Sequence, residues 1–151
     1  MDPAAAYDDH VLVRCLACDA CAVIDERPGV VRLTCPQCGF VKDASPHTGE
    51  AVGRPWLRFA HNFLSIYNSG ETIFGERLWL EATCCGGHRL WALNRRHLDY
   101  IDGFVRSRNR DREFPSAGGN RQLADKFPAW LVSRKHRDEV LRTIERLRST
   151  L

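Results

Sequence analysis

The sequence has no apolar stretch that approaches the ~18 residues of a membrane-spanning helix. Its first ten residues carry Asp2, Asp8 and Asp9, with no basic segment and no apolar segment, so no signal peptide is visible. We therefore expect a cytoplasmic protein that has no membrane partner. Paired cysteines in a reducing compartment indicate metal ligands rather than disulfides.

The motifs of common enzyme classes are also missing. There is no glycine loop for phosphates, no nucleophile elbow and no His-Glu-x-x-His zinc-protease motif. No internal repeat is present. The acidic pair Glu76 and Glu81 flanks an expected strand without further catalytic partners. We expect a protein that is not an enzyme, and no small-molecule substrate is evident.

Composition and charge indicate a globular chain with unlike ends. The chain has 151 residues, of which 44% are hydrophobic and 27% charged, which excludes a disordered chain. Residues 1–54 hold five Lys/Arg and eight Asp/Glu, whereas residues 95–151 hold fourteen basic and eight acidic residues. The N-terminal part is therefore acidic and the C-terminal third is basic.

Four cysteines in two pairs carry the strongest signal. Cys15 and Cys18 form one Cys-x-x-Cys turn, and Cys35 and Cys38 form a second one after sixteen intervening residues. Two such turns aim four sulfurs at one point and close a tetrahedral zinc site. Because protein fills all four positions, we expect one structural zinc ion. Cys21 leaves an iron–sulfur cluster open as an alternative, since Cys-x-x-Cys-x-x-Cys also begins such sites.

The short β-rich runs around these cysteines predict a zinc ribbon. Val11–Val13 lead into the first turn, residues 30–33 lead into the second, and Phe40-Val41 follow it. The segment resembles the zinc ribbon of general transcription factors, the TFIIB type, in its spacing and its Cys-Pro-x-Cys-Gly turn. The resemblance covers about the first third of the chain and implies a role near nucleic acid or in docking protein partners. Asp19 departs from it, because a glycine is usual there.

The remaining sequence predicts an α+β fold with the ribbon at its N-terminus. We expect the ribbon in residues 1–45, a linker in 46–55 and a compact α+β domain in 56–151. In that domain, helical spacing indicates a helix over 56–67 and another over 95–107 capped by Asn94. A β-hairpin is expected between them, with strands at 78–80 and 90–93, and a last helix over 137–147.

This second part is similar to uncharacterised bacterial proteins that carry an N-terminal zinc ribbon. The similar segments are Leu-Trp-Leu-Glu-Ala-Thr-Cys-Cys-Gly-Gly at 78–87, Leu-Trp-Ala-Leu-Asn at 90–94, His-Leu-Asp-Tyr-Ile at 97–101 and Arg-Asp-Glu-Val-Leu-Arg at 137–142. The resemblance implies an architecture and no activity.

Two adjacent cysteines lie in the expected hairpin turn. Cys84 and Cys85 are followed by two glycines and His88, with His97 further along the chain. Three interpretations stay open: packing of the turn, a second metal site with the two histidines, or redox chemistry of the thiols. Neighbouring strand residues point to opposite faces, which disfavours both sulfurs at one ion.

Basic residues gather around the last helix. Arginines at this density are typical of phosphate-binding surfaces, but interleaved Asp and Glu also suit an ordinary solvated helix face. The candidate nucleic-acid-binding residues are Arg134, Lys135, Arg137, Arg142 and Arg146. The four tryptophans are interpreted as core residues, with base stacking as the alternative.

Three functions remain compatible with these patterns. The first is an accessory nucleic-acid-binding protein that uses its basic C-terminal third. The second is an adaptor that docks protein partners through the ribbon and the hairpin. The third is a thiol redox sensor based on the adjacent cysteines.

Overall fold

The computed structural model describes residues 10–27, 30–44, 75–108 and 127–151. Two compact units are present, one spanning Tyr7–Leu80 and the other containing Glu81–Leu151. Together they hold two β-sheets and several helices, which makes the fold α+β, as predicted. The expected linker at 46–55 and the expected helix at 56–67 lie outside the described residues.

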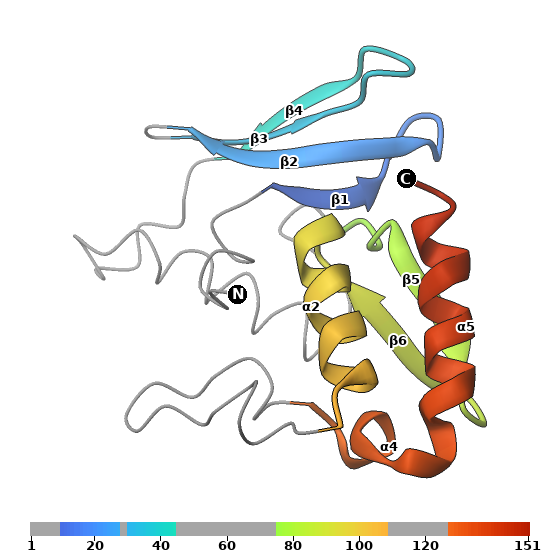
Figure 1. Ribbon diagram of the computed structural model, residues 1–151. Helices are drawn as coiled ribbons and strands as arrows, with labels where there is room; N and C mark the ends of the chain where they lie inside the picture. Colours follow the sequence, from blue (N-terminus) through green and yellow to red (C-terminus); the bar gives the residue numbers. More distant parts are fainter. Residues whose placement is uncertain (1–9, 28–29, 45–74, 109–126) are drawn as a thin grey trace. The chain divides into compact units, whose positions relative to one another are not determined.

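The first unit contains a four-stranded antiparallel sheet in the order β1-β2-β3-β4 (Figure 1). Val11 faces Ile24 across β1 and β2, and Ile24 faces Leu33 across β2 and β3. All three side chains are buried, because cross-strand neighbours on one face pack together. The strands are β1 Val11–Arg14, β2 Cys21–Arg27, β3 Val30–Thr34 and β4 Val41–Ala44.

Residues 77–79 pair with the outer edge of β1. Leu78 forms a β-bridge with Val13, and the Trp79 N–H donates to the Leu12 carbonyl at 3.0 Å. The Arg14 N–H donates in turn to the Arg77 carbonyl at 2.9 Å. The sequence suggested that the hairpin strand starts at residue 78, but these residues complete the β1 edge and the hairpin strand begins at Leu80. The reason is that β1 is an edge strand, and its backbone N–H and C=O groups find hydrogen-bond partners in residues 77–79.

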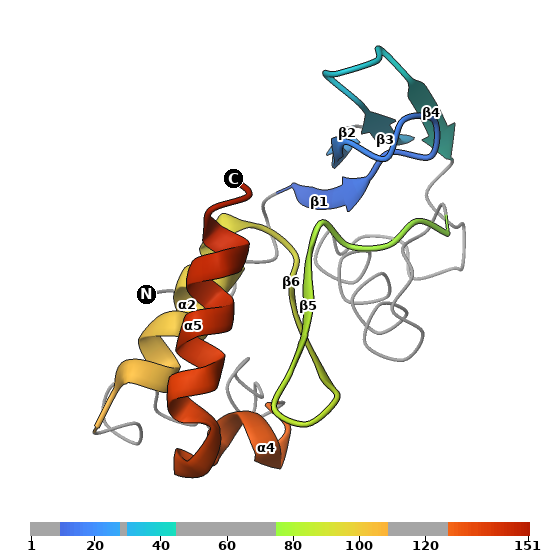
Figure 2. The same ribbon diagram turned by 90° about the vertical axis from the view of Figure 1, so that its right-hand side faces the viewer.

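The second unit combines a two-stranded sheet, β5 Leu80–Cys84 and β6 His88–Ala92, with two main helices. Helix α2 Arg95–Arg106 packs beside α5 Arg137–Arg148 and also contacts β6 (Figures 1 and 2). Short turns, α4 Ala129–Val132 and η3 Arg134–His136, precede α5. The facing apolar residues of both helices are buried as their spacing predicted, including Leu98, Ile101, Val105, Val140, Ile144 and Leu147.

Helix α2 begins where the sequence predicted, at a capping asparagine. The Asn94 side chain accepts a hydrogen bond from the His97 N–H at 2.8 Å, which satisfies one of the free donors at the helix start. The His97 ring reaches back, and its Nδ1 accepts from the Leu93 N–H at 3.1 Å. Burial lowers the pKa of His97 to about 4, so the folded protein keeps this imidazole neutral with its proton on Nε2.

None of the helices within the described ranges combines the length and the apolar character that a membrane crossing requires.

The buried imidazole predicts an acid-sensitive helix. Because the pKa of His97 is about 4 when folded and 6.5 in the reference state, the unfolded chain binds a proton that the folded chain does not between these values. Stability should be complete above pH 6.5 and fall as the pH drops toward 4, by about 3 kcal/mol in all. Amide exchange in α2, measured at several pH values, reports this loss.

The control is His97→Asn, whose side-chain oxygen keeps an acceptor near the Leu93 N–H but does not titrate. Its overall stability is expected to be lower at every pH. Exchange in α2 of the variant should nevertheless lack the extra acid sensitivity of the wild type. An equal pH dependence in both proteins would rule out His97 as its source.

Candidate metal centre

The two Cys-x-x-Cys turns have the same backbone hydrogen bonds. After β1, the Cys15 N–H donates to the Ala20 carbonyl at 2.8 Å and the Cys15 carbonyl accepts from Asp19 at 3.0 Å. After β3, Cys35 makes the equivalent pair with Phe40 and Gly39, both at 2.9 Å. Each turn therefore folds the chain back on itself immediately beyond a strand. The sheet places both turns at the same end.

The position after the second cysteine takes a left-handed backbone conformation in both turns. Gly39 has a φ of 75° and Asp19 a φ of 61°. Glycine adopts this conformation without steric cost, whereas aspartate tolerates it only moderately well. The departure of Asp19 from the usual glycine thus leaves the turn intact. Its carboxylate also lies 3.3 Å from the Arg14 guanidinium on the exposed surface.

The four sulfurs converge on one point. The Sγ atoms of Cys15 and Cys38 lie 3.7 Å apart, and those of Cys18 and Cys35 lie 3.6 Å apart. All four lie within 4.8 Å of one another. Sulfurs bound to one zinc at about 2.3 Å are separated by roughly 3.8 Å in a tetrahedron. The four cysteines are therefore placed to hold a metal ion, and their geometry is compatible with one structural zinc.

Backbone N–H groups point at these sulfurs and favour their charged form. The Ala17 N–H lies 3.3 Å from Cys15 Sγ. The Cys38 N–H lowers the pKa of Cys35 most strongly, with help from the Gln37 N–H, and this pKa is about 7. For Cys18, the Ala20 N–H acts in the same direction, but burial and the neighbouring sulfurs outweigh it and raise its pKa to about 12. A cation among the sulfurs removes this mutual repulsion.

Cys21 is not one of the converging sulfurs. It begins β2 opposite Arg14, and its half-buried thiol has its pKa raised by burial and by Cys35. The first three cysteines therefore do not act as a set. Cys35 and Cys38 complete the group instead, as the ribbon prediction required.

The structure separates the residues that were considered together for a second metal site. Cys84 ends β5, whereas Cys85 lies in the turn with a φ of 55°. The His88 ring stacks on Trp130 at 4.9 Å, and His97 is buried at the start of α2. Among the described residues, Cys85 instead groups with His136 and Glu139. The His-x-x-Glu spacing on one helical face was the available sequence signal for these two.

The basic residues expected to contact phosphate divide into two kinds. Arg134, Lys135, Arg142 and Arg146 are exposed, and the structure gives them no ion pair with any described residue. Arg137 is half-buried and donates to the Arg106 carbonyl at 2.5 Å. The first four are therefore available to a ligand, whereas Arg137 holds α5 to the end of α2.

The three described tryptophans are half-buried rather than fully buried core residues. The Arg14 guanidinium lies 5.1 Å from the centre of the Trp79 ring. Trp91 meets the His97 ring edge-on at 5.6 Å, and Trp130 stacks on His88. Each ring therefore contacts a cation or an imidazole.

Comparisons with known proteins identified no relative of this chain. No family model, no curated protein and no solved structure matches the chain. The interpretation of the site therefore rests on its own geometry.

The converging sulfurs predict which cysteines bind metal. Cys38→Ser should remove the metal ion of the ribbon and unfold the four-stranded sheet, because a small sheet of this kind is held by its metal. Cys21→Ser should keep the metal, since its sulfur lies outside the group. Elemental analysis of the purified variants, with amide exchange in β1–β3, measures both effects.

Metal loss in Cys21→Ser, or iron with visible absorbance in the wild type, would contradict this assignment. In that case the first three cysteines would act together, as in an iron–sulfur site.

Proposed function

We propose that this chain is a non-enzymatic zinc protein with a TFIIB-type ribbon, and that its second unit binds nucleic acid through phosphate contacts. The observation that carries the proposal is a set of exposed cations at η3 and α5 that form no ion pair with any residue in the described ranges: Arg134, Lys135, Arg142 and Arg146. Unpaired surface cations attract phosphates because binding releases the counterions that surround nucleic acid.

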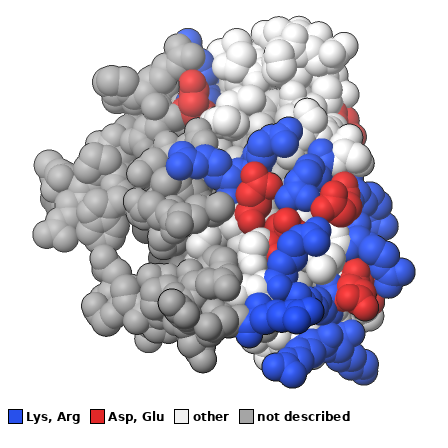
Figure 3. Space-filling view, in the orientation of Figure 1, with Lys and Arg blue, Asp and Glu red and all other residues white. Residues whose placement is uncertain are grey.

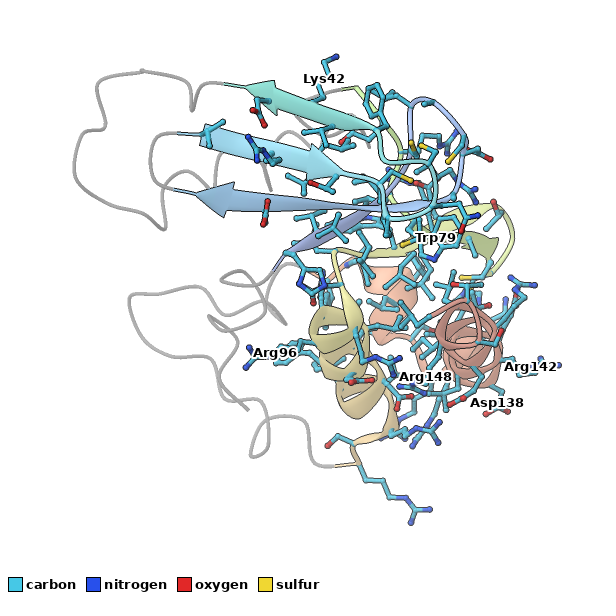
Figure 4. All side chains as sticks on the ribbon, turned by 90° about the horizontal axis from the view of Figure 1, so that it is seen from above. Lys42, Trp79, Arg96, Asp138, Arg142 and Arg148 are labelled. Atoms are coloured by element: carbon cyan, nitrogen blue, oxygen red, sulfur yellow. The ribbon has the colours of Figure 1, made fainter. Side chains whose placement is uncertain are left out.

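The acidic residues nearby are mostly engaged elsewhere. Arg148 lies between α2 and α5 (Figure 4), where it bonds Asp99 at 2.9 Å and Glu145 at 2.8 Å. Arg106 bonds Asp102 at 2.8 Å and Glu145 at 3.2 Å. These ion pairs neutralise one flank of α5. Acidic and basic residues alternate in the sequence, but on the folded helix the paired charges gather on one flank of α5.

The opposite flank of α5 presents Arg142 and Arg146. Arg142 projects away from the helix in Figure 4, as Asp138 does. The exposed residues of η3 and α5 outside these ion pairs include four cations and two carboxylates, those of Asp138 and Glu139, so the charge balance here is positive. On the face shown in Figure 3, blue side chains outnumber red ones over the region of α5. A moderate, salt-sensitive affinity is what such a surface supports.

The zinc in this proposal has a structural role. Four protein sulfurs fill a tetrahedral site, which leaves no position for a substrate or an activated water. The metal then stabilises the fold of the first unit rather than taking part in a reaction. This is the basis for proposing that the ribbon is not a catalytic site.

An adaptor function has one observation in its favour. Leu16 in the first cysteine turn and Val41 in β4 are apolar but 47% and 52% exposed. Exposed apolar side chains on a ribbon are suited to a protein partner. A redox sensor is disfavoured, because burial, Cys84 and the Glu139 charge raise the pKa of Cys85 to about 12. Reactive thiols have the opposite shift.

The charge separation on α5 predicts which arginines matter. Arg142→Ala with Arg146→Ala should weaken nucleic-acid binding and reduce the slope of log K against log salt by roughly 2, because two phosphate contacts are lost. Fluorescence anisotropy with single- and double-stranded DNA and RNA, at several salt concentrations, measures both quantities.

The matched control is Arg106→Ala with Arg148→Ala, which removes the same formal charge from the paired flank. Its salt slope should stay close to that of the wild type. Equal effects of the two double variants would show that only net charge matters, and no binding at low salt would favour the adaptor function.

A further inference from the structure

A second group of metal-binding side chains lies in the unit that contains Glu81–Leu151, outside the ribbon. It combines the Cys85 thiol with the His136 imidazole and the Glu139 carboxylate. One ligand atom from each residue lies within 4.8 Å of the other two. Sulfur, nitrogen and oxygen donors on three side chains form a ligand set that zinc accepts, with a fourth position left to water.

The chain brings these residues together from two distant segments. Cys85 comes from the turn between β5 and β6, whereas His136 and Glu139 occupy positions i and i+3 at the start of α5. Residues at this spacing share one helical face. The Cys85 N–H donates to Glu139 Oε1, so the turn and the helix are already tied together. The second carboxylate oxygen is left for a metal.

The local backbone holds Cys85 in an unusual conformation. Its φ is 55°, and Gly86 and Gly87 follow with φ of 81° and 102°. A non-glycine residue in the left-handed region is uncommon and costs free energy. Glycine would adopt this backbone conformation at no steric cost. The presence of cysteine instead suggests that its thiol has a use. Cys85 is buried, and its thiol lies close to His136 and Glu139.

Each of the other two ligands suits a metal at the surface. The His136 ring is half-exposed and has no hydrogen-bond partner among the described residues. Glu139 is exposed, so an ion can reach the group from solvent. In a tetrahedral zinc site, ligand atoms lie about 3.3–3.8 Å apart. The ligand atoms of the three residues lie within 4.8 Å of one another, so the group is somewhat wider than a loaded site.

We propose that Cys85, His136 and Glu139 bind a second zinc ion, which joins the hairpin turn to the start of α5 and keeps one coordination position open to water or an external anion. This site shares no ligand with the ribbon zinc site, and its test is a metal count that requires no nucleic acid. Neither Cys84 nor His88 belongs to it, because the structure does not place their ligand atoms in the group.

The test is zinc stoichiometry of the full chain after dialysis against buffered zinc. Two zinc ions per chain are expected for the wild type, and one for His136→Ala and for Glu139→Gln. The glutamine keeps an oxygen that accepts from the Cys85 N–H, so this variant should fold normally. Loss of a direct ligand should weaken the second site more than about 100-fold, because even indirect partners of a metal cost roughly 10–100-fold.

Two control variants and a second probe identify the ligands. Cys84→Ser and His88→Ala should retain both zinc ions. Cobalt should be added to a chain that carries zinc in the ribbon alone. It binds such sites more weakly than zinc and so leaves the ribbon zinc in place, and at the second site it should give a charge-transfer band with the intensity of one thiolate. That band should be absent in Cys85→Ser. Far-ultraviolet circular dichroism checks that each variant keeps its helices.

Three results would overturn the proposal. One is a single zinc ion in the wild type at saturation. Another is a second zinc ion that persists in both His136→Ala and Glu139→Gln. The third is evidence that Cys84 is a ligand, which would assign the metal to the adjacent cysteine pair. Such evidence would be loss of the second zinc ion in Cys84→Ser, or a cobalt band with the intensity of two thiolates.

Discussion

Convergence of the four sulfurs is the constraint on which the first unit depends. Its sheet is built from strands of four to seven residues, and a sheet of this size supplies little net stability by itself. A structural zinc site contributes about 10–16 kcal/mol in comparable peptides. A metal ion held by both cysteine turns would therefore supply a large share of the stability of the sheet. Backbone N–H groups directed at the sulfurs help, because they stabilise thiolates before any cation arrives.

The second unit follows a different principle, since α2 and α5 are held by an apolar interface. Leu98, Ile101 and Ile144 are buried there, and the charged residues are arranged around that contact. Arg106 and Arg148 join the two helices through carboxylates, so one flank of α5 is neutral. Exposed ion pairs add little stability. Their larger consequence is that Arg142 and Arg146 form no ion pair with any described residue and stay exposed.

Much of the fold could be predicted because local signals and tertiary packing agree. Asn94 marks the start of α2, and the 3.6-residue period placed Val140 and Ile144 on the inner face of α5. Prediction and structure disagree where a segment pairs with a strand that is distant in the sequence. Trp79 was expected in a hairpin strand, but its N–H bonds Leu12 on the edge of β1. No pattern within residues 75–80 indicates which edge needs covering.

The sequence by itself determined which four cysteines come together in the ribbon. Cys-x-x-Cys spacing confines two sulfurs to one turn, so the fold has only to bring two such turns side by side. Only the tertiary structure decided which arginines among the described residues form ion pairs, since two of the three carboxylates that bond Arg148 lie on α2, more than forty residues away. It also decided that Cys85 meets His136 and Glu139. Such contacts depend on how the hairpin and α5 pack, and side-chain packing over that distance has no local sequence signature.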